Sequence, residues 1–293
     1  METINRTTYT KKGFDDRIVR YEEIHKVKEK DYKALIEAID PQEGDKIFEG
    51  CAGYADISKR ICEATKEYKV KPEIYIQDES LVQMNRAKTE LALPEDHMLL
   101  GDIRTIEMSD NFFDKAVIKM GVHELPKDEQ PRVFAEIYRI LKPGGKFIIW
   151  ELSLNNDYQE IFQDIIRKKD ELSGFDAMVN NRYFQRHDEL EALFFEAGFL
   201  DIKDEYKMRY IFNPRGRFEE LVSKDRLELI NLKGKLSVED EQVLNKKSEE
   251  RVMCLVDYIR GRLPEDKKSL VNYKDLGNDL EITVDKVIMS GTK

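Results

Sequence analysis

Short apolar segments alternate with longer amphipathic segments through the first half of the chain, and this order constrains the fold more than any other feature. The apolar segments have the length of strands and lie at 46–49, 73–77, 97–100, 113–120 and 146–151. The amphipathic segments between them have helical spacing and lie at 55–68, 80–91 and 128–141. Strands that alternate with helices predict an α/β fold, in which helices cover both faces of a parallel sheet.

The order of elements changes after Glu151. Helices are predicted at 156–172 and 188–197, and strands at 199–212 and 280–290. An insertion between two strands usually covers the edge or the functional rim of a sheet, so the polar stretch between the last two strands predicts a cap. The predicted regions are an N-terminal helical segment at 1–44, a core at 45–212 with a helical insert near 153–184, a helical cap at 213–279 and a final core strand at 280–293.

The charge balance and the distribution of apolar residues exclude several classes of protein. The 293 residues include 49 Lys and Arg against 59 Asp and Glu, which gives a formal net charge of −10. An acidic chain repels phosphate backbones, so a nucleic-acid partner is not expected. Apolar runs reach only a few residues, as in Phe147–Trp150, so we expect neither a membrane span nor a secretory signal.

The cysteines and histidines suggest a reducing compartment without a metal site. Cys51, Cys62 and Cys254 form an odd set without the spacing of a disulfide framework, which favours the cytoplasm. The four histidines show no zinc-ligand spacing, so no metal site is expected. The sequence leaves the oligomeric state open between a monomer and a homodimer.

The loop after the first predicted strand is the first place to expect a ligand, because ligands of open parallel sheets bind beyond the carboxyl ends of the strands. Residues 50–53 of this loop are Gly, Cys, Ala and Gly, and small residues let the backbone turn sharply and approach a ligand closely. The dinucleotide fingerprint G-x-G-x-x-G is absent, since Gly50 and Gly53 are three apart and no third glycine follows. The loop therefore favours a nucleoside ligand without phosphates.

Short motifs along the chain match one large enzyme family in that family's order. The loop pattern E/D-x-G-x-G-x-G falls on Glu49, Cys51, Gly53 and Ala55, with two glycines replaced by other small residues. The later landmarks are Asp78, Gly101-Asp102-Ile103, Met120–Leu125, Leu141–Lys146 and Glu196–Phe199. Over roughly 30–212 and the final strand, the chain resembles the class I S-adenosylmethionine-dependent methyltransferases. The resemblance implies a Rossmann-like, seven-stranded sheet with one antiparallel strand at Leu280–Ser290 and a helical cap inserted before it.

The same resemblance implies S-adenosylmethionine as the cofactor and a set of residues that bind it. Asp78 would hold the ribose hydroxyls, since a carboxylate accepts from two neighbouring hydroxyls, and Asp102 with Ile103 would contact the adenine. The residues implied in cofactor binding are Glu49, Gly50, Cys51, Gly53, Tyr54, Asp78, Glu79, Asp102, Ile103 and Met120.

The residues themselves leave alternatives open at several of these positions. Glu49 could cap nearby amides, and Asp78 could cap the following helix, with Glu79 taking its place at the ribose. Asp102 could cap a loop, and Ile103 could pack in the core instead of against adenine.

Methyl transfer from a sulfonium needs an aligned nucleophile and the exclusion of water, and for oxygen or nitrogen acceptors it also needs proton removal. His123 follows the fourth strand and titrates near neutrality, so it is the candidate general base, or else a polar loop residue bonded to backbone. Glu151 ends the fifth strand and is the second catalytic candidate. The candidate substrate residues are Tyr158, Arg182 and Tyr183 of the insert, although Tyr183 could simply staple the next helix.

The predicted function is S-adenosylmethionine-dependent methyl transfer to a small-molecule acceptor, at oxygen or nitrogen, with carbon as a further option. One alternative is a protein that binds the cofactor without catalysis, as a partner or sensor subunit. Another is a protein methyltransferase, and the acidic charge balance makes a nucleic-acid methyltransferase the least favoured branch.

Overall fold

The computed structural model describes residues 28–154, 157–175, 179 and 181–293. Contacts within the chain divide these residues into two compact units. The sheet unit comprises 28–154, 182–209 and 285–293, and the helical unit comprises the described residues of 157–181 together with 210–284. The boundaries predicted from the sequence stay a prediction.

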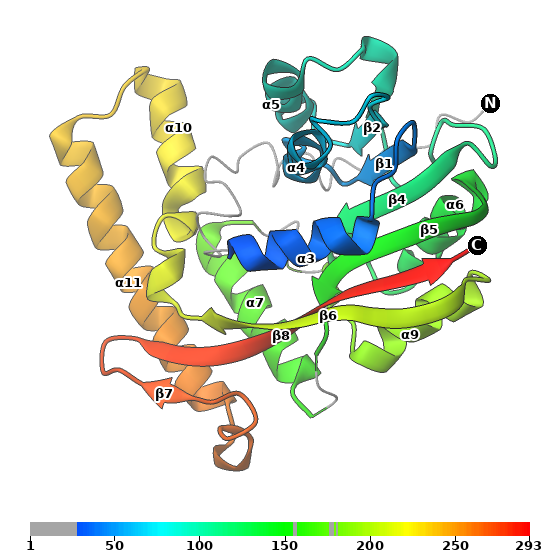
Figure 1. Cartoon of the computed structure of the whole chain (residues 1–293). Coiled ribbons are helices and arrows are strands. Elements are labelled where there is room, and N and C mark those ends of the chain that lie inside the picture. The colour runs from blue at the N-terminus through cyan, green and yellow to red at the C-terminus, as the bar shows by residue number, and fades with distance from the viewer. Residues whose placement is uncertain (1–27, 155–156, 176–178, 180) are drawn as a thin grey trace, which may run out of the picture. The chain divides into compact units, whose positions relative to one another are not determined.

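The sheet confirms the α/β fold that the alternating pattern predicts. Its strands are β1 (Lys46–Gly50), β2 (Glu73–Asp78), β3 (Met98–Leu100), β4 (Phe113–Lys119), β5 (Leu141–Leu152), β6 (Leu200–Phe212) and β8 (Leu280–Thr292), in the order β3-β2-β1-β4-β5-β8-β6 (Figure 1). The pairs from β3 to β5 are parallel, and β8 runs antiparallel to β5. A two-residue strand, β7 (Lys274–Asp275), pairs with the start of β8 and was not predicted.

The strand order reverses at β1, which lies between β2 and β4. In an open parallel sheet, a ligand binds beyond the carboxyl ends of the strands at such a reversal. The loops that follow β1, β2 and β4 are therefore the part of the fold that can hold a ligand.

Helices cover both faces of the sheet. They are α3 (Glu29–Ile39), α4 (Asp56–Ala64), α5 (Leu81–Leu91), α6 (Gln130–Ile140) and α9 (His187–Glu196). Figure 1 shows α3 in front of the sheet and α6 behind it, and α6 packs against both β5 and α9. Phe134, Phe147, Phe194 and Phe199 are all buried here, and each ring centroid lies within 5.7 Å of at least one of the others. This aromatic cluster fixes β5 against α6 and α9.

Strand β5 begins at Leu141, five positions before the predicted start at 146. From the sequence, Pro143-Gly144-Gly145 predicts the end of a helix. In the structure, Leu141 already pairs with Phe113 of β4. A register shift between Phe113 and Lys115 accommodates the extra residues. Proline and glycine thus mark an irregularity within the strand rather than its boundary.

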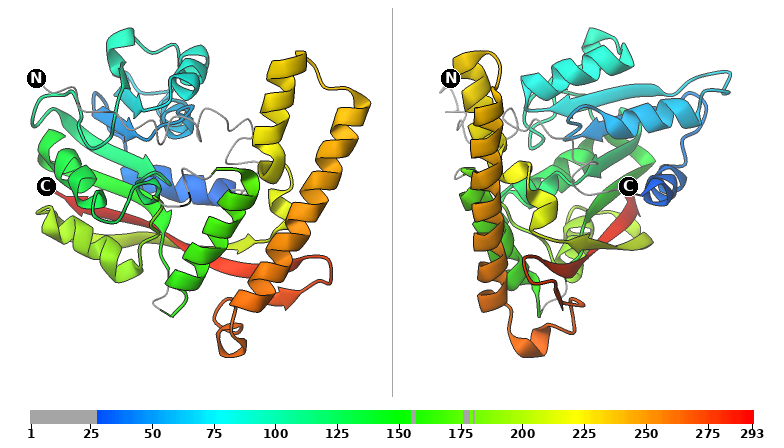
Figure 2. Two further views of the ribbon diagram at one scale, coloured as in Figure 1. Left: turned by 180° about the vertical axis from the view of Figure 1, so that it is seen from behind. Right: turned by 90° about the vertical axis from the view of Figure 1, so that its left-hand side faces the viewer.

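The helical unit contains α7 (Gln159–Ser173), α10 (Ser223–Lys233) and α11 (Val238–Arg262), and Figure 2 shows α10 and α11 as neighbouring helices. Helix α11 packs against α7, and Arg262 pairs with Asp164 at 2.6 Å. Lys169 is buried and pairs with Asp170 at 2.7 Å and with Glu220, so its charge is compensated. Among the described residues, no helix is both long enough and apolar enough to cross a membrane.

Candidate functional site

The loop between β1 and α4 turns through three left-handed residues. The backbone angle φ is 52° at Cys51, 56° at Gly53 and 58° at Ala55. These are the alternate positions at which the sequence pattern has small residues. A residue with a Cβ costs about 1–2 kcal/mol in this conformation, so Cys51 and Ala55 hold backbone strain that Gly53 does not.

Glu49 fastens the end of β1 to the start of α4. Its buried carboxylate accepts hydrogen bonds from the amide of Ser58 at 2.8 Å, from the amide of Ile57 at 3.4 Å and from the Ser58 hydroxyl. Burial raises the pKa of Glu49 to about 7, although the hydrogen bonds from Ser58 act in the opposite direction. The capping role that the sequence left open is therefore present, and a cofactor contact by Glu49 stays a prediction.

Asp78 ends β2 and lies directly beside the small-residue loop. Its Oδ2 accepts from the amide of Gly53 at 2.8 Å, and its Oδ1 accepts from the amide of Ser80 at 2.8 Å. Ser80, rather than Asp78, caps α5 through a hydrogen bond from Gln83. A carboxylate oxygen can accept more than one hydrogen bond, and ribose binding by Asp78 stays a prediction.

Asp102 and Ile103 follow β3 and have different surroundings. The carboxylate of Asp102 accepts from the backbone amide of Arg104 at 2.8 Å and from its Nε at 2.9 Å. Burial raises the pKa of Asp102, but the hydrogen bonds and charge of Arg104 outweigh it and leave the pKa below its ordinary range. Ile103 is buried in the core, where its Cδ1 would lie 2.6 Å from a Cβ added to Gly50. The core alternative for Ile103 is thus present.

The remaining predicted cofactor residues line the same edge of the sheet. Tyr54 is half-buried, with the ammonium of Lys59 4.9 Å from its ring centroid. Glu79 is half-buried in the turn after β2. Met120 follows β4 with a left-handed φ of 53°, and its amide donates to the carbonyl of Trp150 at 2.8 Å. This bond holds the start of the loop after β4 against β5.

His123 lies at the centre of a buried chain of alternating charges, which we call the charge network: Arg182, Glu124, His123 and Glu151. Nδ1 of His123 donates to Oε1 of Glu151 at 2.6 Å, and Nε2 lies 3.4 Å from Oε1 of Glu124. Nη2 of Arg182 donates to Oε1 of Glu124 at 2.7 Å. The ring of Phe184 stacks on His123, with 4.8 Å between the centroids.

The carboxylates of this network hold a proton on His123. Burial would lower the pKa of His123, but the facing carboxylates of Glu151 and Glu124 raise it to about 9. At neutral pH the side chain is therefore an imidazolium that donates through Nδ1 to Glu151 and whose Nε2–H faces Glu124. In this arrangement it lacks the free lone pair that a general base needs. The role of His123 as a base stays a prediction that requires a change of protonation.

The charge network adjoins the small-residue loop. Gly121 immediately precedes the 3-10 helix that carries His123, and a Cβ added to Gly121 would collide with Cβ of Cys51 and lie 2.7 Å from its Sγ. Burial and the charges of Asp78, Glu151 and Glu124 raise the pKa of the Cys51 thiol well above its ordinary value. Carboxylates from three strand ends thus lie near the loop, and those of Glu124 and Glu151 are balanced by Arg182 and His123.

The three predicted substrate residues have different surroundings. Arg182 joins the charge network, whereas the hydroxyl of Tyr183 donates to Glu189 at 2.7 Å and accepts from Lys127 at 3.0 Å. Only the backbone amide of Tyr183 reaches the network region, where it donates to the carbonyl of His123 at 3.0 Å. Tyr158 belongs to the helical unit and is buried beside Phe162, and its hydroxyl has no hydrogen-bond partner among the described residues.

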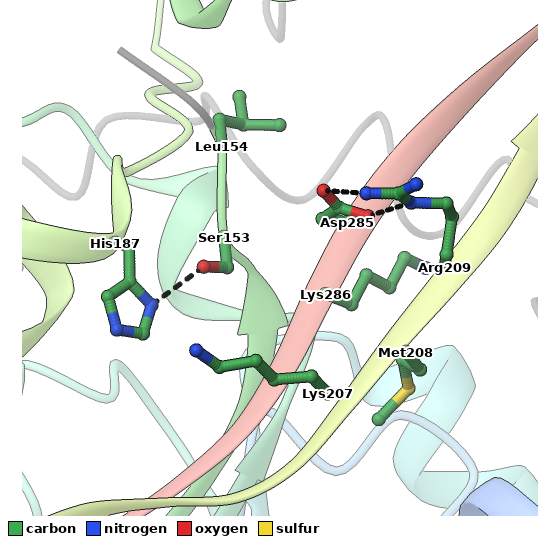
Figure 3. A pocket seen from close by; sticks show the side chains of 8 residues that line it. All are labelled: Ser153, Leu154, His187, Lys207, Met208, Arg209, Asp285 and Lys286. Atoms are coloured by element: carbon green, nitrogen blue, oxygen red, sulfur yellow. Dashed lines mark hydrogen bonds and ion pairs between the residues drawn. The ribbon is translucent and has the colours of Figure 1, made fainter. Parts of the chain in front are cut away.

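A separate pocket of about 400 Å³ lies in the sheet unit, and sequence reasoning did not predict it (Figure 3). Its lining residues are Ser153, Leu154, His187, Lys207, Met208, Arg209, Asp285 and Lys286. Inside it, Ser153 shares a hydrogen bond of 2.8 Å with His187, and Arg209 pairs with Asp285 at 2.6 Å. These residues come from segments far apart in the chain, so no local sequence signal could have found the pocket.

Comparison with known protein families shows which family this chain belongs to. The model of the ubiE/COQ5 methyltransferase family matches residues 14–209, about two thirds of the chain. The chain belongs to the ubiE/COQ5 methyltransferase family. This membership confirms the resemblance noted in the sequence, and it makes the protein an S-adenosylmethionine-dependent methyltransferase of small molecules.

Relatives of this ubiE/COQ5 family member agree with the assignment. A demethylmenaquinone methyltransferase of Geobacillus sp. (strain WCH70) is 29% identical over 179 residues, which cover 55% of this chain and 74% of the relative. The YcgJ protein of Bacillus subtilis has a similar fold, with a TM-score of 0.64, 12% identity, and coverage of 91% of this chain and 99% of that one. Phosphoethanolamine N-methyltransferase 2 of Haemonchus contortus, solved with S-adenosyl-L-methionine, gives a TM-score of 0.51 at 18% identity, over 98% of this chain and 58% of that one.

The site of this ubiE/COQ5 family member fits the cofactor S-adenosylmethionine, which supplies a methyl group on a positively charged sulfur. The left-handed turns at Cys51, Gly53 and Ala55 bring bare backbone to the carboxyl edge of β1. The space beside Gly53 is open, since an added Cβ would contact nothing within 4 Å. The carboxylate of Asp78 lies beside Gly53, and a carboxylate suits the hydroxyl donors of a ribose.

Proposed function

We propose that this methyltransferase methylates a ring carbon of a hydroxylated aromatic acceptor, the reduced form of demethylmenaquinone or a close analogue. The observation that carries this proposal is the similarity over 179 residues to a demethylmenaquinone methyltransferase. Residues beyond 209 lie outside the family match, so the similarity does not extend to them.

The reduced form follows from the chemistry of the methyl group. A sulfonium methyl reacts with an electron-rich atom, and the ring carbon of a quinone is electron-poor. Reduction to the hydroquinone places electron density on the carbons beside each hydroxyl. The reduced ring is therefore the nucleophile.

The protonation of His123 favours carbon over oxygen or nitrogen as the methylated atom. An oxygen or nitrogen acceptor must lose its proton to a base as it attacks. An electron-rich ring carbon first forms the bond to the methyl group as S-adenosylhomocysteine leaves, and the ring then loses its proton to water. The pKa of His123 is about 9, so this side chain already carries its proton at neutral pH. We propose that the residues of the loop at 50–54, together with Asp78 and Asp102, hold the cofactor, and that the charge network faces the acceptor.

The test uses purified protein, S-adenosylmethionine with a deuterated methyl group, and 1,4-naphthohydroquinone kept reduced with dithionite. We expect a product that has gained one deuterated methyl group on carbon, identified by mass spectrometry and NMR. The oxidised 1,4-naphthoquinone is the matched control and should give no product. A methyl ether as the product, or equal turnover of the oxidised ring, would contradict the proposal.

A further inference from the structure

Glu151 lies fully buried at the end of β5, and only one of its carboxylate oxygens has donors. Oε1 accepts from Nδ1 of His123 at 2.6 Å and from the amide of Leu152 at 3.0 Å. Oε2 is buried and has no hydrogen-bond partner among the residues that the structure describes. A buried carboxylate oxygen without a donor is costly and rare, so a donor from outside the chain is a natural partner for it.

The position of Glu151 places this oxygen at the ligand-binding edge of the sheet. Trp150 pairs with Lys119 at the end of β4, so Glu151 lies one residue beyond that pair, beside the loop that begins at Met120. The contact between Gly121 and Cys51 joins the same loop to the small-residue loop after β1. Oε2 of Glu151 therefore belongs to the edge at which β1, β4 and β5 end, where ligands of such sheets bind.

The rest of the charge network fixes the orientation of this carboxylate. His123 donates to Oε1, and the Phe184 ring stacked on the imidazole limits its rotation. Glu124 faces the other ring nitrogen of His123 and is itself held by Arg182. Oε1 accepts from both sides, so Oε2 is the carboxylate oxygen that lacks a donor among the described residues.

We propose that Oε2 of Glu151 accepts a hydrogen bond from a hydroxyl group of the methyl acceptor and thereby positions its ring. This inference rests on the proposed function, since it takes a hydroxylated aromatic as the acceptor. The ammonium group of the cofactor is also a hydrogen-bond donor, so the acceptor hydroxyl and this ammonium group are the two sources that suit Oε2. The experiment below separates the two sources.

The experiment compares wild type with Glu151→Gln, using 1,4-naphthohydroquinone and its dimethyl ether, 1,4-dimethoxynaphthalene, as ligands. Binding of each is measured with S-adenosylhomocysteine present. A hydrogen bond from a hydroxyl to a carboxylate contributes about 10- to 100-fold in affinity. We expect wild type to prefer the hydroquinone by that factor and Glu151→Gln to reduce the preference to about threefold or less. This is a double-mutant cycle between the hydroxyls of the ligand and the carboxylate.

Two controls keep the result specific. The exposed Glu191 of α9 provides the matched variant Glu191→Gln, which should keep the wild-type preference. The affinity of Glu151→Gln for S-adenosylhomocysteine should stay within about twofold of wild type, because that nucleoside would not be the partner of Oε2. If Glu151→Gln does not fold, Glu151→Asp takes its place, and a wild type that binds the ether as tightly as the hydroquinone overturns the inference without any variant.

The outcomes are distinct. A wild type that methylates the hydroquinone but binds the ether equally well overturns this inference and leaves the proposed function standing. A Glu151→Gln variant that loses affinity for S-adenosylhomocysteine but keeps the preference overturns it too, and assigns Oε2 to the cofactor. A wild type that neither binds nor methylates any hydroquinone rejects the proposed function, and this inference with it.

Discussion

The imidazole of His123 and the carboxylate of Glu151 form a buried pair, with 2.6 Å between Nδ1 and Oε1. The pair joins the loop after β4 to the end of β5, across 28 residues of sequence. It lies at the same carboxyl edge of the sheet as the small-residue loop.

The charge on His123 predicts a specific pH dependence of stability. Its pKa is about 9 in the folded protein, above the ordinary value of 6.5, so the folded state binds the proton more tightly. This contribution is fully present below about pH 6.5 and is lost as the pH rises through 9. We expect the free energy of unfolding to fall by on the order of 3 kcal/mol over this interval.

Urea unfolding of wild type and His123→Asn across pH 6–10 measures this slope. His123→Asn should lose most of this pH dependence of the free energy of unfolding. The control variant His187→Asn replaces a half-exposed histidine and should follow wild type. Parallel slopes for wild type and His123→Asn would show that His123 does not carry the proton.

The raised pKa of Glu49 predicts a second pH dependence of the free energy of unfolding, at lower pH. Its pKa is raised from 4.5 to about 7 by burial, so its contribution to stability is present below about pH 4.5 and is lost as the pH rises through 7. Glu49→Gln removes the ionised form while keeping the shape of the side chain. We expect the variant to gain stability relative to wild type between pH 5 and pH 8, by about 1–3 kcal/mol, in thermal or urea unfolding. A constant difference between the two proteins across this range would contradict the assignment.

The left-handed backbone at Gly53 predicts opposite effects for the same substitution at two glycines. Gly53 has a φ of 56° and open space around it, so Gly53→Ala adds backbone strain without a clash and should cost about 1 kcal/mol. Gly261 lies in α11, also with open space, and there Gly261→Ala should stabilise by about 0.5–1 kcal/mol. Calorimetric melting of both variants measures the two changes in stability. A change of the same sign in both variants would contradict the left-handed conformation of Gly53.

The contact between Gly121 and Cys51 predicts a rescue. Gly121→Ala would drive its Cβ into the Cys51 side chain, and overpacking of this kind costs about 1–3 kcal/mol. Cys51→Gly removes the obstructing atoms at a left-handed position that glycine prefers. We expect the double variant to melt above Gly121→Ala alone and to regain affinity for S-adenosylhomocysteine. Additive losses in the double variant would mean that the two loops are not in contact.

The sequence predicts β1 to β4 well because each of them is a short, mainly apolar segment followed by a turn or loop. The start of β5 is an exception, since the Pro143-Gly144-Gly145 turn interrupts the apolar pattern while the backbone of Leu141 still pairs with Phe113. Hydrogen bonding of the backbone does not depend on the apolar pattern, so the sequence cannot show where pairing begins.

The candidate site is predictable only where it follows strand ends. Asp78, His123 and Glu151 each end or follow a strand, and the topology brings them to one edge. Arg182 and Tyr183 were predicted together, but their side chains have different partners, since Arg182 donates to Glu124 and the Tyr183 hydroxyl donates to Glu189. Only Arg182 therefore reaches Glu124, 58 residues earlier in the chain, and local sequence holds no signal for which of the two it would be.

The most direct test of the account is a calorimetric titration of S-adenosylhomocysteine into wild type, Asp78→Asn and the exposed control Asp96→Asn. Asp78 binds the Gly53 amide at 2.8 Å and would hold the ribose beside the small-residue loop. We expect wild type and Asp96→Asn to bind S-adenosylhomocysteine with equal affinity. The affinity of Asp78→Asn should be lower by about 10- to 100-fold. A wild type that does not bind the nucleoside, or an Asp78→Asn variant that binds it as tightly as wild type, would contradict the account.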